Sequence, residues 1–90
     1  LISEEVEKGI AVAAAATGSA VTDFHVGPVF PEEPGRPGRH VYLVEFHGGP
    51  PADLGRFADA LDAELSRLNE DYAAHRVGDL TMLRPEIRPV

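Results

Sequence analysis

The clearest structural pattern in the chain is the stretch HVYLVEFHGGPPADLGRFADALDAELSRLNEDYAAHR, residues 40–76. Its first part, His40–His47, is rich in β-favouring residues and largely apolar on both faces, which is typical of a central strand covered on two sides. Gly48–Pro51 breaks the strand, and apolar residues then recur at three- and four-residue steps from about Asp53 to Arg76. The stretch therefore predicts a buried strand followed by one long amphipathic helix.

Before this stretch, the sequence predicts a helix and a further strand. Ser3 is a suitable N-cap for a helix over about Ser3–Thr17, and Gly18 is suited to end that helix in the left-handed conformation. Small residues on one face of the helix predict close packing against a sheet. Val21–Phe30 is typical of a strand. Regular alternation would give this strand one face with Thr22, Phe24 and Val26 and another with Val21, Asp23 and His25.

Prolines and glycines define the remaining segments. Pro31–Arg39 is expected to be a loop that joins the first two strands into an antiparallel hairpin. Glu86–Val90 predicts a short third strand, which Pro85 and Pro89 restrict to an edge or a short pairing. We therefore predict an α+β fold in the order helix, strand, strand, helix, strand, with a mostly antiparallel sheet packed with helices. The strand order within the sheet is left open.

Composition limits the function. Ninety residues fit a single small domain over residues 1–90, and 8 Lys plus Arg against 15 Asp plus Glu give a net charge of -7. This balance argues against nucleic acid or an anionic membrane as a partner. The absence of cysteine excludes disulfides and thiolate chemistry. No apolar run approaches the roughly 20 residues that a membrane helix needs, and the acidic N-terminus is unlike a signal peptide, so we expect a cytoplasmic protein.

No motif that carries chemistry is complete in the sequence. Lys8 is the single lysine and no glycine-rich phosphate motif is present, so no nucleotide site is predicted. The four histidines are scattered, and only Asp23 with His25 or Glu45 with His47 could form a two-ligand fragment, so no metal site is predicted. The carboxylates of the long helix are interpreted as a solvated face: Asp59, Asp62, Glu64, Glu70 and Asp71.

Four segments carry a family resemblance when they are taken in order. Pro37–Phe46 is similar to the glycine-led strand, ending in an acidic residue, of the auxin-responsive promoter family. Leu83–Arg88 resembles its Pro-Leu-Glu-Ile-Arg strand with proline and leucine displaced, and Ile2–Val6 resembles the helix that opens its small domain. The positions that resemble its long C-terminal helix are Leu61, Asp62, Leu65, Leu68, Asn69, Tyr72 and Arg76.

The resemblance implies a C-terminal domain of an acyl-acid amido synthetase, a ligase of the adenylate-forming, luciferase-like superfamily. Such enzymes use ATP and Mg²⁺ to form an acyl-adenylate and then transfer the acyl group to an amine, usually an amino acid. ATP and the acid bind to a large N-terminal adenylation domain, over which the small C-terminal domain swings as a lid. The resemblance therefore implies that the partner of this chain is the adenylation domain of the same protein, and that the chain alone is inactive.

The resemblance carries over no catalytic, cofactor-binding or metal-binding residue. The family's late lysine would follow the last strand, after Val90. Six positions that match the family are interpreted as structural or domain-contact residues: Tyr42, Glu45, Asn69, Tyr72, Arg76 and Arg88. The alternative hypothesis is a freestanding αββαβ interaction or regulatory module that buries its bare sheet edge by forming a homodimer. Three strands and two helices leave at least one face of the sheet incompletely covered, which suits either docking or dimerisation.

Overall fold

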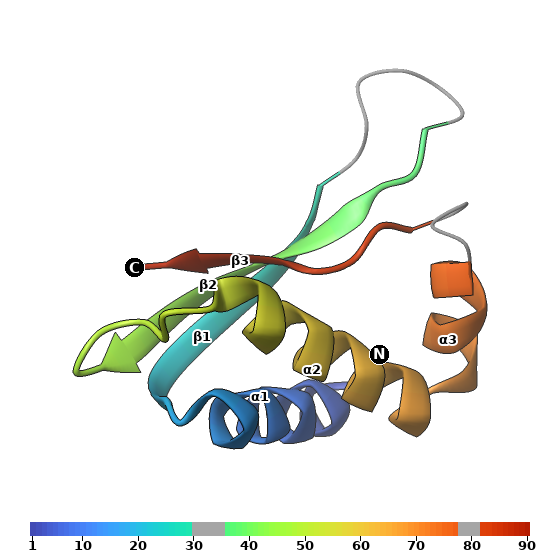
Figure 1. Ribbon diagram of the computed structural model, residues 1–90. Coiled ribbons are helices and arrows are strands. Elements are labelled where there is room, and N and C mark those ends of the chain that lie inside the picture. The colour runs from blue at the N-terminus through green and yellow to red at the C-terminus, as the bar shows by residue number, and fades with distance from the viewer. Residues whose placement is uncertain (30–35, 78–81) are drawn as a thin grey trace.

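The computed structural model describes residues 1–29, 36–77 and 82–90, in which the helices lie on one side of a three-stranded sheet (Figure 1). In chain order the elements are α1 (Ser3–Thr17), β1 (Ala20–Val29), β2 (Arg39–His47), α2 (Leu54–Leu68), α3 (Glu70–Arg76) and β3 (Glu86–Pro89). The predicted α+β class and element order are confirmed, although the second helical region is divided in two. Phe30 and most of the predicted hairpin loop lie outside the described residues.

The strand order in the sheet is β1-β2-β3, with β2 in the centre. β2 pairs antiparallel with β1, from Ala20 opposite His47 to Val29 opposite Arg39. β3 pairs parallel with β2 from Val41 opposite Glu86 to Val44 opposite Pro89. The pairing is short and lies at an edge of the sheet, as the prolines of this segment predict. The sheet is therefore mixed, with the longer pairing antiparallel, and α2 and α3 form the crossover between the two parallel strands.

The core lies between the sheet and the two long helices, which run antiparallel beside each other (Figure 1). Every second residue of β2 points into it, and the ring of Phe46 meets that of Phe57 on α2 edge-to-face at 5.4 Å. The apolar residues that recur along the predicted long helix pack into the core, where Leu61 and Leu65 are fully buried. No helix in the described part of the chain is long and apolar enough to cross a membrane.

The prediction that β2 is covered on both faces is wrong. Tyr42, Val44 and Phe46 are buried beneath the helices, whereas Leu43 on the other face keeps 39% of its surface exposed and Glu45 is exposed beside it. Both long helices pack side by side on the same face of the sheet, so none of the described helices covers the opposite face. Leu43 therefore lies at a surface of the protein, whereas Val41 on the same face is buried at 8% exposed.

The predicted alternation of the first strand fails at a β-bulge near its start. Val21 lies opposite Phe46 and Asp23 opposite Glu45, so Thr22 is the extra residue on β1. Val21 consequently shares the inner face with Phe24, although strict alternation would separate them. The Thr22 hydroxyl donates to Glu45 Oε1 at 2.8 Å and fixes the bulge to the neighbouring strand.

Helix α1 begins one residue earlier than the Ser3 cap predicts and packs most closely on α2. Its N-cap is Ile2, whose backbone N–H donates to Glu5 Oε1 at 3.0 Å. Gly18 ends the helix with φ 64°, as predicted. A Cβ at Gly9 would lie 2.8 Å from Leu61 Cδ1 on α2, so glycine allows the two helices to approach. The small-residue face therefore serves a helix–helix contact more than the predicted contact with a sheet.

The single long helix predicted over Asp53–Arg76 is wrong, because Asn69 divides it. Asp53 caps α2 as its side chain accepts from the N–H of Arg56 at 3.0 Å. Asn69 has extended backbone angles, φ −140° and ψ 111°, and its Oδ1 accepts from the N–H of Tyr72 at 2.9 Å. It is thus both the C-cap of α2 and the N-cap of α3.

Candidate functional site

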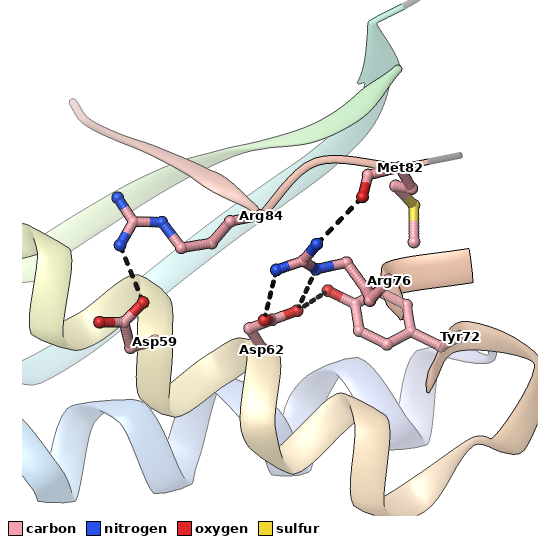
Figure 2. Close-up of polar contacts among 6 residues, drawn as sticks. All are labelled: Asp59, Asp62, Tyr72, Arg76, Met82 and Arg84. Carbon is pink, nitrogen blue, oxygen red and sulfur yellow. Dashed lines mark hydrogen bonds and ion pairs between the residues drawn. The ribbon is translucent and has the colours of Figure 1, made fainter. Parts of the chain in front are cut away.

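A partly buried carboxylate, Asp62 on α2, is the centre of the main polar cluster (Figure 2). It accepts from the hydroxyl of Tyr72 at 2.7 Å and from Arg76 Nε and Nη2 at 2.7 and 2.8 Å. Only 19% of the Asp62 side chain and 14% of the Arg76 side chain are exposed. The two oxygens of Asp62 bind the guanidinium in the bidentate geometry that gives strong, oriented ion pairs. We call Asp62, Tyr72 and Arg76 the Asp62 cluster.

The Asp62 cluster also holds the segment that leads into β3. Arg76 Nη1 donates to the carbonyl of Met82 at 3.0 Å, and the N–H of Met82 donates to the carbonyl of His75 at 3.1 Å. The next N–H, of Leu83, donates to the carbonyl of Gly38 at 2.8 Å, just before β2 begins. α2, α3 and the start of β2 are therefore connected through residues 82–83.

A second ion pair lies beside the cluster but at the surface. Arg84 Nη1 donates to Asp59 Oδ1 at 2.8 Å, as Figure 2 shows, and the Asp59 side chain is 67% exposed. Asp59 lies three residues before Asp62 on the same helix, but its charge remains in water. The two carboxylates therefore provide a matched pair, one largely buried and one solvated.

Burial keeps two tyrosine hydroxyls of this region protonated. Desolvation, followed by the negative charge of Asp62, raises the pKa of Tyr42 to about 12. Desolvation is also the main reason that the pKa of Tyr72 is raised, and its hydrogen bond to Asp62 adds to the shift. The Tyr42 hydroxyl is buried without a hydrogen-bond partner, within the part of the chain that the structure describes. Neither hydroxyl can serve as a base near neutral pH.

The structure divides the six residues singled out from the sequence between the two sides of the sheet. Tyr72 and Arg76 both contact Asp62, and Tyr42 lies in the core nearby. Asn69 lies between α2 and α3, and its Nδ2 donates to Glu5 Oε1 at 3.1 Å. Asn69 and the N–H of Ile2 together lower the pKa of Glu5, the backbone contact most. The remaining two, Glu45 and Arg88, lie on the face that no described helix covers.

The role of Asp62 is not evident from the sequence. The solvated-face interpretation describes Asp59 correctly, whereas Asp62 turns toward α3 and is mostly buried. No local signal in the sequence sets Asp62 apart, since Asp59 directly follows the buried Ala58 just as Asp62 directly follows the buried Leu61. The partners of Asp62 lie beyond Asn69, and a single straight helix would carry them away from it.

The described residues show no cluster of ligands for a metal ion. None of their histidines, aspartates and glutamates gather into a group of three or more that could hold a metal ion. The fragment of Asp23 and His25 is an exposed contact of 3.9 Å. A largely apolar cavity of about 420 Å³ lies between the start of α1 and the strands, with His40 and Tyr42 in its lining. Burial lowers the pKa of His40, so its imidazole is neutral there.

Comparison with protein families gives the decisive match. The sequence model described as the GH3 family C-terminal domain matches residues 4–90. The chain belongs to the GH3 family. The match runs through every helix and strand of the structure, so the Asp62 cluster and both faces of the sheet are parts of this GH3 domain.

At the level of the family, the resemblance of the sequence is confirmed. Neither the curated proteins nor the solved structures include a match to this GH3 domain. Its geometry gives a body of two layers whose last strand is fixed to the helices through one ion-paired cluster, with an open sheet surface on the other side.

Proposed function

We propose that this GH3 domain is the C-terminal lid domain of an ATP-dependent acyl-acid amido synthetase and has no catalytic activity alone. The whole enzyme would form an acyl-adenylate from a carboxylic acid and ATP, then transfer the acyl group to an amine or amino acid. ATP and Mg²⁺ would bind to the adenylation domain of the same protein, which is the proposed partner. The observation that carries the proposal is the match to the C-terminal domain of this family over residues 4–90.

The proposed contribution of the domain is positional. A lid that closes over an acyl-adenylate excludes water from a reactive mixed anhydride and brings its own surface to the reacting groups. Such a movement requires a body that does not deform as it turns. The Asp62 cluster supports this role, because Arg76 connects α2 and α3 to the segment before β3 through hydrogen bonds of 2.7 to 3.0 Å.

The proposal is tested first on the 90-residue chain itself. With ATP, Mg²⁺ and a mixture of carboxylic acids and amino acids, the chain is expected to release no AMP above the rate of a buffer blank. Catalysis requires a nucleotide site, and the sequence carries none of its motifs. AMP release that persists in a preparation of the chain, and disappears when the chain is denatured, would contradict the proposal.

A second candidate function is a freestanding interaction module, and the uncovered face of the sheet favours it. The sequence-based hypothesis is that two copies of the module dimerise by pairing the bare edges of their sheets. β1, however, carries the bulge at Thr22 and a proline at Pro28, and β3 is only four residues long and ends at Pro89. Bulges, prolines and short edge strands all discourage edge pairing. If the module associates, the open face of the sheet is the better surface.

A further inference from the structure

The open face is the side of the sheet opposite α1 and α2, and its central row on β2 is Arg39, Val41, Leu43 and Glu45. β3 adds Glu86 beside Val41 and Arg88 beside Leu43. We infer that two copies of this chain stack their open faces on each other in a two-fold symmetric homodimer. The inference concerns the chain as such and does not depend on the synthetase proposal.

The apolar centre of the face has a projection and a hollow next to each other. Leu43 projects from it with 39% of its surface exposed. One step along the sheet, Gly27 lies opposite Val41, and no atom lies within 4 Å of the place where a Cβ of Gly27 would be. Gly27, Val41 and Leu43 help to line a shallow hollow of about 340 Å³. In a two-fold stack the Leu43 of each copy enters the hollow of the other, so the contact is made twice.

The charges that β2 presents on the open face complement themselves in one orientation. Along β2 the order is a cation at Arg39, the apolar pair Val41 and Leu43, and an anion at Glu45. A two-fold axis in the plane of the sheet, perpendicular to the strands and passing between Val41 and Leu43, places Glu45 of one copy over Arg39 of the second. A two-fold axis that runs along the strands would instead place like charges over each other, and complementary interfaces avoid such contacts.

The charges of β3 are complementary about the same two-fold axis. Arg88 lies beside Leu43 and Glu86 beside Val41, so the same two-fold axis brings Arg88 of one copy over Glu86 of the second. Within one copy Glu86 already pairs with Arg88 and, at 3.1 Å, with Arg39. The stack therefore extends an existing ion pair into a network across the interface. This agreement on two strands is what identifies a second copy as the occupant of the face.

The size of the face predicts a weak dimer. Three strands about 4.8 Å apart and about nine residues long present roughly 400 Å² per copy. Two such faces bury less than the roughly 1,200 Å² at which stable interfaces begin, which is the range of transient association. Self-association is therefore expected at high concentration and not as an obligate dimer.

The test is sedimentation equilibrium of the chain from about 20 µM to roughly 1 mM, a span that covers weak association. We expect a monomer–dimer equilibrium. Glu45→Arg leaves the row with two basic ends and Arg39→Glu leaves it with two acidic ends, so each variant alone is expected to associate at least about 10-fold more weakly. An equimolar mixture of the two variants is expected to restore association, because each then meets opposite charges.

Two further variants separate the face from the rest of the molecule. Leu43→Arg is expected to abolish association, whereas Val12→Arg, at a similarly exposed valine on α1, is expected to leave it unchanged. Circular dichroism confirms that each variant is folded. A chain that stays monomeric to roughly 1 mM, or variants whose mixture associates no better than each alone, would overturn the inference. Association that survives Leu43→Arg would also overturn it and indicate edge pairing. Mass is the readout, so the result is independent of enzymatic activity.

Discussion

At the level of single residues, the structure depends most on where two aspartates of the same helix point. Asp62 satisfies a largely buried arginine and a buried tyrosine hydroxyl, while Asp59 pairs with Arg84 in water. The sequence does not distinguish them, since both are carboxylates between apolar residues of an amphipathic helix. What separates them is the turn of the chain at Asn69, which brings the partners of Asp62 back to it.

The two aspartates give a matched test of this difference. Asp62→Asn removes the charge that balances Arg76 and is expected to lower the free energy of unfolding by about 2–3 kcal/mol, since breaking a buried pair is costly. Asp59→Asn removes an exposed pair and is expected to change it by less than about 1 kcal/mol. Urea denaturation followed by circular dichroism measures both. Equal losses for the two variants would show that the Asp62 cluster is no stronger than a surface pair.

The two buried tyrosines predict a loss of stability at alkaline pH. Folding raises the pKa of Tyr42 from about 10 to about 12 and raises that of Tyr72, so both hydroxyls stay protonated in the folded chain where they ionise in the unfolded one. Their contribution is complete below pH 10 and is lost as the pH rises toward 12. The free energy of unfolding is therefore expected to fall by about 2 kcal/mol or more over this range.

Tyr42→Phe is the control for this pH dependence. The variant removes one of the two titrating hydroxyls, and its alkaline loss is expected to be smaller than that of the native chain. Near neutral pH it is expected to be as stable as the native chain or up to about 1 kcal/mol more stable, because the lost hydroxyl has no partner among the described residues. An alkaline loss of the same size in Tyr42→Phe would show that this tyrosine does not cause it.

At the level of secondary structure, the sequence predicts the elements well where one local rule decides them. Gly18 ends α1 as predicted, and α2 begins directly after Asp53, where the apolar period of the sequence starts. The sequence-based prediction fails where two rules compete. Asn69, followed by Glu70 and Asp71, is a helix N-cap signal inside an apolar period that continues across it, and the cap determines the structure.

The bulge at Thr22 is a different kind of failure. An extra residue on β1 is defined only by pairing with Glu45 and Phe46 on another strand, so no local pattern reveals it. The number of elements does predict that one face of the sheet is incompletely covered, but it does not place Leu43 there, because an apolar residue is equally compatible with a second buried layer. The Asp62 cluster could not be assembled from sequence for the same reason, since it requires the relative placement of α2 and α3.

Asn69 tests how strongly a single cap residue determines the division between α2 and α3. Asn69→Ala removes the cap of α3 and the contact with Glu5, and we expect a loss of about 1–2 kcal/mol in the free energy of unfolding. Hydrogen exchange is expected to rise first in α3. Asn69→Ser keeps a side-chain oxygen for the N–H of Tyr72 and should lose clearly less. If serine and alanine have the same effect, the cap does not hold α3 in place.

At the level of the whole molecule, the helices and the sheet provide two different surfaces on one small body. The helical side is closed by the core and by the Asp62 cluster, while the open face of the sheet displays an apolar centre between charges of opposite sign. Membership of the GH3 family identifies this body as a C-terminal domain of that family. The lid proposal is tested by enzymatic activity, whereas the homodimer inference is tested by the mass of the chain in solution.

One measurement tests the proposed function most directly. The polypeptide encoded by the reading frame that contains these residues is assayed for ATP-dependent amide formation, with AMP release and mass spectrometry of the product, beside a version that lacks residues 4–90. We predict that the complete polypeptide forms an amide from a carboxylic acid and an amino acid, and that the shortened version does not. A shortened version that forms the amide at the same rate would contradict the account.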